Sequence, residues 1–186
     1  MIDDTPERLL LDRLPTPIGE ALVITDEIGQ LRALDWAECE DKMQVLLRHH
    51  YGSLAVAQGH LPQRLRQALI SYFDGEYSSL ESVEWRTAGA SFQRLVWTTL
   101  TTIPPRRTLS YAGLAAKIGR PKAVRAVGRA NAANPISIVV PCHRVIGTDG
   151  SLTGYGGGIE RKRWLLNHEG ATFRQNGLAD HSGAHP

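Results

Sequence analysis

NPISIVVPCHRVI, residues 134–146, is an apolar run that leads to three reactive side chains. Residues 136–140 are apolar apart from one serine and predict a buried strand or extended segment. This segment would carry Cys142 from the interior to a polar position beside His143 and Arg144. Such neighbours can favour the thiolate form of a cysteine, so Cys142 is a candidate nucleophile. A free cysteine more often serves as a small buried hydrophobic residue, and these residues alone leave that interpretation open.

His143 follows Cys142 directly, which limits how the two side chains can cooperate. Adjacent side chains on an extended segment point to opposite faces, so the direct Cys–His contact of a cysteine protease is not expected. A bridging water could instead connect the imidazole of His143 to the thiol. Glu169, in the sequence NHEG at residues 167–170, could orient that imidazole from behind. The pattern therefore indicates a proton relay.

Metal and nucleotide binding are two other uses of such residues, and the sequence favours neither. Consecutive Cys and His do not have the spacing of zinc ligands, and Cys39 forms no recognisable ligand set with the histidines at 49, 50 and 60. Residues 147–158, GTDGSLTGYGGG, contain six glycines but match neither common phosphate-binding pattern. We therefore expect no metal and no cofactor. We interpret this glycine loop as a shaped, mobile wall for a flat substrate, with Tyr155 as its apolar face.

The sequence changes character near residues 86–91, and a helix is predicted directly after this change. Ser91 is expected to be its N-cap, and Pro104-Pro105 ends it. Its apolar stripe consists of Phe92, Leu95, Val96, Leu100 and Ile103. The change of character predicts a boundary between two units.

Two more helices are predicted before the cysteine segment. Ser110 can cap a short helix over residues 111–118, and Gly119 stands at its C-terminal end. Pro121 suits the first position of the next helix, which continues over residues 122–133. Two helices with a short glycine-containing turn between them have the arrangement of a helix-turn-helix.

The last of these helices carries mostly small side chains. Arg125 and Arg129 are four residues apart and share one face. A surface of Ala123, Ala126 and Gly128 with one projecting arginine resembles what binding in the DNA minor groove requires. Small residues also permit tight packing between helices in a core. Spacing alone does not decide between these interpretations.

The first part of the chain predicts a small α/β module. Residues 18–25 and 31–36 are β-rich runs joined by a short polar segment, which is typical of a hairpin. Residues 41–50 and 62–73 place apolar side chains at helical spacing, and Asp74-Gly75 supplies a stop for the second helix.

Composition excludes several classes of protein. The chain has 186 residues, of which 42% are hydrophobic and 22% charged, which indicates a soluble globular protein and not a disordered one. The sequence contains no apolar stretch of membrane-spanning length and no secretory signal, so a cytoplasmic location is expected. Two cysteines cannot form a disulfide scaffold, and both are expected to be free thiols. A net charge of +2 is too small to indicate nucleic-acid binding by itself.

Taken together, these motifs resemble the O6-alkylguanine-DNA alkyltransferases, also called methylated-DNA:protein-cysteine methyltransferases. The resemblance spans about residues 15–173 and is strongest over residues 92–170. It rests on the sequences TPIG, SYAGLA, RAVGRAN, NPISIVV, PCHRVIG, GYGGG and NHEG. It implies an α/β domain of the ribonuclease-H-like type over residues 1–88, followed by a helical, winged-helix-like DNA-binding domain with a helix-turn-helix over residues 89–175. Residues 176–186 are expected to form a flexible tail.

The resemblance also implies roles for the relay residues. Cys142 would accept the alkyl group, His143 would be the water-mediated base, and Glu169 would polarise His143. Asn134 would brace the site. Tyr111 would press on the 3′ phosphate of the target nucleotide and lie near the base.

The same resemblance implies how DNA and base are held. Arg125 would enter the base stack in place of the extruded guanine, and Lys122 belongs to the same DNA-binding segment. The minor groove would be lined by Ala123, Ala126 and Gly128. The flipped base would be held by residues around Val145, Tyr155, Gly156 and Gly157. Lys162 matches a position that supports the loop.

Two departures from the family pattern limit what is implied. Some members carry a zinc site in the N-terminal domain, but its cysteines have no counterparts here, so the metal is not transferred. Some homologues have a serine where this chain has Gly156, which removes a hydroxyl near the base and leaves the substrate range open.

The function implied by the resemblance is direct-reversal DNA repair. The protein would flip an alkylated nucleotide out of the duplex and transfer its alkyl group irreversibly from O6 of guanine, or O4 of thymine, to Cys142, once per molecule. It would bind double-stranded DNA through the minor groove with little sequence preference, as a monomer that could bind cooperatively. Two alternatives stand beside this one. The first is a non-catalytic protein that recognises alkylated DNA, although such relatives generally lack the acceptor cysteine. The second is a helix-turn-helix transcription factor with a structural cysteine.

Overall fold

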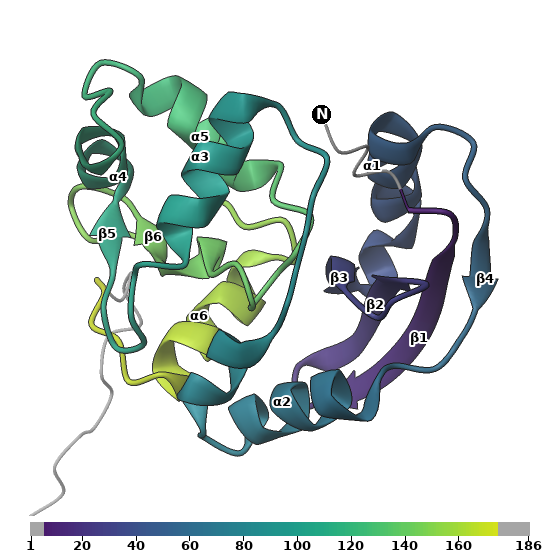
Figure 1. Ribbon diagram of the computed structural model, residues 1–186. Coiled ribbons are helices and arrows are strands. Elements are labelled where there is room, and N and C mark those ends of the chain that lie inside the picture. The colour runs from purple at the N-terminus through teal and green to yellow at the C-terminus, as the bar shows by residue number, and fades with distance from the viewer. Residues whose placement is uncertain (1–5, 175–186) are drawn as a thin grey trace, which may run out of the picture.

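The computed structural model describes residues 6–174 and shows two groups of elements packed against each other (Figure 1). A four-stranded sheet and two helices come from the first part of the chain, and a mainly helical group comes from the rest. The predicted flexible tail at residues 176–186 lies outside the described residues. Within residues 6–174, each helix is too short or too polar to cross a membrane.

The sheet has the strand order β3-β2-β1-β4. Its strands are β1 (Leu9–Thr16), β2 (Gly19–Asp26), β3 (Leu31–Trp36) and β4 (Val56–Gln58). The first three are antiparallel neighbours, and β4 pairs with β1 in parallel. The hairpin predicted from residues 18–25 and 31–36 is confirmed as β2 and β3. In its turn Asp26 Oδ1 accepts a hydrogen bond from Gln30 N (2.8 Å), and Gly29 adopts the left-handed conformation that glycine tolerates, with φ +85°.

β1 and β4 have no counterpart among the predicted elements. β1 contains Asp12, Arg13 and Pro15, which interrupt an apolar alternation. The structure satisfies these charges at long range, since Arg66 donates to Asp12 (2.6 Å) and Arg13 donates to Glu40 (2.8 Å). β4 is a three-residue edge strand with only exposed side chains, so it carries no hydrophobic signal.

α1 (Glu40–Tyr51) and α2 (Gln63–Phe73) confirm the two helices predicted in this part of the chain. They cover opposite faces of the sheet because successive side chains of a strand point to opposite sides. Leu22 and Ile24 of β2 pack with buried residues of α1. Val23, between them, belongs with α2 to the main core.

The remainder of the described chain is mainly helical. Its helices are α3 (Ser91–Leu100), α4 (Tyr111–Lys117), α5 (Val124–Ala132) and α6 (Ile159–His168). β5 (Leu109–Ser110) and β6 (Val145–Ile146) form a short parallel pair. The 3₁₀ turns are η1 (Ala37–Cys39), η2 (Tyr77–Ser82) and η3 (Cys142–Arg144). Ser110 caps α4 as predicted, because its Oγ accepts a hydrogen bond from Gly113 N (3.0 Å). α4 and α5 are the two helices predicted for the helix-turn-helix.

The start of α3 differs from the prediction. Ser91 is the first helical residue, and the N-cap is Ala90, whose backbone N–H donates to Gln93 Oε1 (2.9 Å). The side chain that satisfies this helix end therefore comes from inside the helix. Leu95, assigned to the apolar stripe, is 43% exposed, so the buried stripe is narrower than predicted.

The start of α5 also differs. Pro121 is not the first helical residue, because residues 120–123 form a turn that is closed by a hydrogen bond from Ala123 N to Arg120 O (2.8 Å). The helix begins at Val124.

The predicted strand at residues 136–140 is buried throughout but is not a strand. Ile136 forms a single parallel bridge with Leu34 at the free edge of β3. The chain then turns, with Val140 N donating to Ile136 O (3.1 Å) and Ile138 held at φ +70°. The apolar pattern predicted burial correctly, but it does not distinguish a strand from a tightly folded buried segment.

The two groups of elements share one core. Its largest buried cluster joins Leu34 of the sheet, Val96 of α3 and Cys142. The segment that connects the two groups also adheres to the sheet, since Trp85 bridges to Leu31. The cysteine segment is therefore built against the edge of β3, and the sheet takes part in forming the site.

Candidate active site

Cys142 begins η3, directly after the buried turn at residues 136–140. The residue is 6% exposed. Its backbone N–H donates to Val140 O (2.8 Å), and its carbonyl accepts a hydrogen bond from Asn131 Nδ2 (3.5 Å). These bonds fix the backbone around the sulfur, and Cys142 lines a pocket.

The pocket at Cys142 is narrow, with a volume of about 20 Å³. It is lined by Asp35, Lys42, Asn131, Ala132, Asn134, Ser137, Cys142, Gly154, Tyr155 and Gly156. These residues come from the end of α5, the segment that follows it, the glycine loop and the N-terminal sheet region. A space of this size holds about one water molecule. A base can enter only when side chains at the mouth or the loop move.

Burial raises the pKa of the Cys142 thiol, although a hydrogen bond from Asn134 and the charge of Lys162 favour the thiolate. The guanidinium of Arg144 donates to the carboxylate of Glu169 (2.8 Å). The resting cysteine is a thiol and needs a base.

Glu169 follows α6, is fully buried, and accepts four hydrogen bonds from three side chains. His143 Nε2 (2.9 Å) and Tyr72 Oη (2.7 Å) both bond Oε1. Arg144 donates to both carboxylate oxygens, at 2.8 Å each. Burial opposes ionisation of Glu169, but its bonds to His143 and Arg144 outweigh burial and hold its pKa well below the usual range. Glu169 is therefore a carboxylate at neutral pH.

His143 is fully buried, and burial lowers its pKa, so its imidazole is neutral. A carboxylate can only accept hydrogen bonds, so the ring proton sits on Nε2 and is donated to Glu169. The other nitrogen, Nδ1, is then an acceptor. It is buried and makes no hydrogen bond to any of residues 6–174. The ring thus offers an unused basic nitrogen, one residue from the cysteine.

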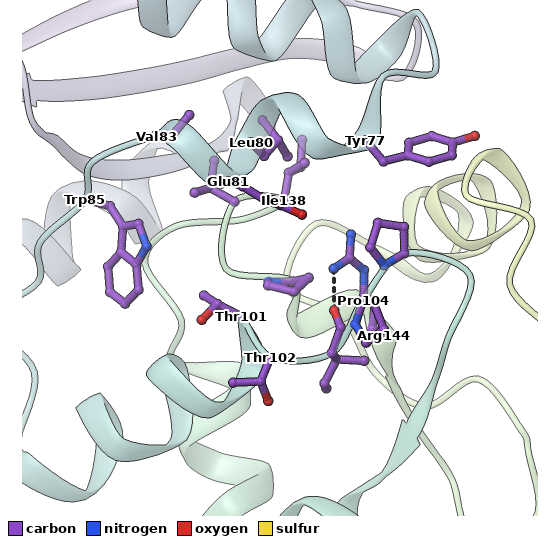
Figure 2. Close-up of a pocket in the computed structure, with 14 residues that line it drawn as sticks. Tyr77, Leu80, Glu81, Val83, Trp85, Thr101, Thr102, Pro104, Ile138 and Arg144 are labelled. Carbon is purple, nitrogen blue, oxygen red and sulfur yellow. Dashed lines mark hydrogen bonds between the residues drawn. The ribbon is translucent and has the colours of Figure 1, made fainter.

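Tyr72 and Arg144 bind Glu169, a role that the sequence did not predict for either residue. Tyr72 lies within the apolar pattern of α2, where a tyrosine is indistinguishable from ordinary core. Arg144 also donates to Ile103 O (2.6 Å), at the wall of a second cavity of about 390 Å³ (Figure 2). Only the three-dimensional fold brings α2 and η3 to the same carboxylate.

Asn134 and Lys162 hold the backbone around the cysteine. Asn134 Nδ2 donates to Val140 O (2.8 Å), which secures the turn before Cys142. Lys162 is fully buried and donates to Val145 O (2.6 Å) and Thr153 O (3.2 Å), so it links β6 to the glycine loop. Burial lowers the pKa of Lys162 to about 8. The roles predicted for Asn134, as a brace of the site, and for Lys162, as a support of the loop, stay predictions.

α5 presents one face to the core and another to solvent. Val127, Ala130 and Asn131 are buried, whereas Arg125 and Arg129 are exposed. The buried face packs in the core, and binding of DNA by the exposed face stays a prediction.

The other residues predicted to contact DNA lie on α4, on α5 and in the turn between them. Lys122 is exposed, and Ala123, Ala126 and Gly128 are half-buried. A Cβ on Gly128 would lie 3.8 Å from the ring of Tyr111, so the two helices approach closely at this point. Tyr111 Oη accepts a hydrogen bond from Thr153 Oγ1 (3.1 Å), and the residue does not line the pocket at Cys142.

The glycine loop packs against β3. A Cβ on Gly157 would lie 2.3 Å from Trp36 Nε1, so only glycine fits there. Tyr155 and Gly156 line the pocket, and their role in holding the base stays a prediction. Val145 is buried in β6, and neither it nor Gly157 lines the pocket in this structure.

Comparison with known proteins identifies the family. Residues 91–171 match the family model of the 6-O-methylguanine DNA methyltransferase DNA-binding domain. Over 166 residues the chain is 49% identical to a methylated-DNA–protein-cysteine methyltransferase of Salmonella typhimurium, and the match covers 88% of this chain and 96% of that protein. This chain belongs to the methylated-DNA–protein-cysteine methyltransferases. The predicted family is confirmed.

Solved structures agree with membership of this methyltransferase family. The OGT of Mycobacterium tuberculosis, solved in complex with DNA, has a TM-score of 0.73 and 38% identity, with 88% of this chain and 92% of that chain covered. The O6-methylguanine-DNA methyltransferase of the archaeon Pyrococcus kodakaraensis has a TM-score of 0.65 and 26% identity, with 88% and 99% covered. The mixed α/β fold of this methyltransferase is therefore the fold of its relatives.

Proposed function

We propose that this methyltransferase repairs alkylated DNA by moving an alkyl group, methyl above all, from O6 of guanine to the sulfur of Cys142. One observation carries the proposal. A buried thiol in a pocket is followed in the chain by a neutral histidine, and that histidine has a carboxylate behind it and an unused basic nitrogen. The relatives described above support this activity. O4-alkylthymine is proposed as a second substrate.

The first step removes the thiol proton. Nδ1 of His143 takes the proton of Cys142 through a bridging water, and Glu169 stabilises the imidazolium that forms. Because Arg144 and Tyr72 already hold Glu169 in place as a carboxylate, the stabilising charge needs no rearrangement.

The thiolate of Cys142 then attacks the alkyl carbon. The S–C bond forms as the C–O6 bond breaks, and the electron pair of the broken bond moves onto guanine. With DNA bound, Tyr111 gives guanine a proton and regains one from solvent, so the base leaves neutral. The product at Cys142 is a thioether, a poor leaving group. Each molecule therefore accepts one alkyl group and acts as a stoichiometric reagent that needs no cofactor.

The proposed DNA complex places the exposed face of α5 against the duplex. We assign residues 1–88 to a ribonuclease-H-like domain and residues 89–175 to a winged-helix-like domain that binds the minor groove as a monomer. Flipping a nucleotide costs a few kcal/mol, and insertion of Arg125 into the stack offsets part of that cost. Binding to phosphates makes the affinity dependent on salt and nearly independent of sequence.

The bacterial relatives support a cytoplasmic location.

The proposed function is tested by mass. The protein is incubated with duplex DNA that carries one O6-methylguanine, and in parallel with unmodified DNA. We expect the protein to gain one methyl group, on the peptide that contains Cys142, with no further gain when damaged DNA is in excess. Tight binding to the modified duplex without a gain in mass would contradict the proposal, and would favour a protein that only recognises the damage.

Replacing Arg125 with alanine tests base flipping. Without Arg125, no side chain fills the position in the base stack that the flipped nucleotide leaves. Transfer from duplex DNA should therefore slow by roughly 10- to 100-fold, equivalent to a few kcal/mol of unstacking. Transfer from the free base O6-methylguanine, which needs no flipping, should keep the parental rate. Arg129→Ala is the matched control, since it removes the same charge one turn along the same exposed face. Equal slowing of both substrates by Arg125→Ala would show that the arginine does not act in flipping.

A further inference from the structure

Lys42 brings a cation from the N-terminal domain to the pocket at Cys142. It lies on α1, 100 residues before Cys142 in the chain, and lines the same pocket. The end of its side chain lies close to the glycine loop, because a Cβ on Gly156 would be 2.8 Å from Lys42 Nζ. Gly156 therefore leaves open the space that the ammonium group approaches.

The ammonium group of Lys42 is not used by the fold. It makes no hydrogen bond, and no ion pair within 4.0 Å, to any of residues 6–174. Asp35, the other charged residue that lines the pocket, is largely buried and accepts a hydrogen bond from its neighbour Trp36 N (3.0 Å). The charges of Asp35 and Lys42 interact, which favours a position of the lysine near the pocket. An ammonium group that lines a reactive pocket and makes no hydrogen bond to residues 6–174 is available to a ligand.

We propose that Lys42 contacts the substrate base and donates a hydrogen bond to the acceptor edge, O6 and N7, of the flipped alkylguanine. This inference rests on the proposed function and adds to it a specificity residue from the N-terminal domain. Guanine presents two acceptors on that edge, which an ammonium group matches. As the C–O6 bond breaks, negative charge grows on the base, and a cation beside that edge stabilises it. Lining side chains or the glycine loop must also move as the base enters, since the pocket in this structure holds only about 20 Å³.

The proposal is tested with Lys42→Met, which keeps most of the length of the side chain and removes the donor. Lys42 is exposed, so the variant should fold as the parent does. Methylation of Cys142 is followed by peptide mass with two substrates: a duplex that carries O6-methylguanine, and free O6-methylguanine base, which has no phosphate. We expect the rate with both substrates to fall by roughly 10- to 100-fold, as for a lost hydrogen bond to a charged group. Lys42→Arg, which keeps a donor, should restore most of the rate.

Arg48→Met is the matched control, because Arg48 is an exposed cation on the same helix that lines a different pocket. It should leave the rate with the free base unchanged. A parental rate for Lys42→Met with the free base would overturn the proposal, and slowing confined to the duplex would assign Lys42 to a phosphate instead. If the parent protein accepts no methyl from either substrate, the proposed function itself fails, which is a different result.

Discussion

Cys142→Ser is expected to abolish alkyl transfer while DNA binding stays close to the parental level. A hydroxyl group ionises far less readily than a thiol, so the relay through His143 that suffices for sulfur does not produce an alkoxide. The exchange changes little volume, and the exposed face of α5 is separate from the sulfur, so the fold and the DNA surface should persist. Mass after incubation with the O6-methylguanine duplex should show no added methyl group. Titration with the same duplex should give the parental affinity.

Cys39→Ser is the matched control for this result. Cys39 is the other cysteine of the chain and lies beside the pocket, where its Sγ donates to Gly156 O (3.6 Å). The variant should still gain one methyl group per molecule. A methyl group on the Cys142→Ser protein, or its loss from the Cys39→Ser protein, would place the acceptor at Cys39.

Local sequence signals predicted much of the fold. The β2–β3 hairpin, α1, α2 and the cap of α4 follow from apolar spacing and from Ser110, which act within a few residues. The same signals could not predict β1, because the charges of Asp12 and Arg13 are satisfied by Arg66 and Glu40, which are distant in the chain. They also could not separate a buried strand from the buried turn that the structure shows at residues 136–140.

The candidate site was predictable where its residues belong to the motifs NPISIVV, PCHRVIG and NHEG. His143 and Glu169 form a hydrogen-bonded pair, and Asn134 Nδ2 donates to the turn before Cys142. Contributions from the first domain carry no local signal. Tyr72 resembles core within a helix, and Lys42 resembles a solvent-facing lysine, until the shared core places both at the site. The sequence also could not predict the protonation state of the Cys142 thiol, because its pKa depends on burial as much as on neighbouring charges.

The buried carboxylate explains how a poorly ionised thiol can react at neutral pH. Burial of Cys142 keeps the proton on sulfur until the base acts. Burial of His143 keeps the imidazole neutral and able to accept. Glu169 is the one member of the relay that is charged at rest. Hydrogen bonds from Arg144 and Tyr72 stabilise its carboxylate form. The relay is therefore ready for proton transfer, and its negative charge is shielded from solvent.

Glu169→Gln is expected to reduce both stability and transfer rate. The substitution leaves the buried guanidinium of Arg144 without its anion, which should cost about 3–5 kcal/mol of unfolding free energy. A glutamine amide can donate to Nε2 of His143 and so favour the ring tautomer with its proton on Nδ1, the nitrogen that must accept. Transfer at neutral pH should fall by about 10²-fold or more, as when a general base is lost. Denaturant unfolding and single-turnover methylation measure the two effects separately.

The pH dependence separates a positioning role for Glu169 from a purely structural one. Raising the pH deprotonates the thiol of Cys142 directly, so the transfer rate of folded Glu169→Gln protein should rise toward the parental rate in alkaline solution. A defect of constant size at every pH would contradict the relay.

The stability of the protein should also depend on pH, at the acid end. Because the folded-state pKa of Glu169 is depressed, its contribution is complete above the unfolded value of about 4.3 and is lost as the pH falls further. The parent should therefore lose stability more steeply than the variant below about pH 4.

Tyr72→Phe is the milder comparison. It removes one of the four hydrogen bonds to Glu169 and leaves the charge, so about 0.5–1.5 kcal/mol of stability should be lost, with little change in the pH profile.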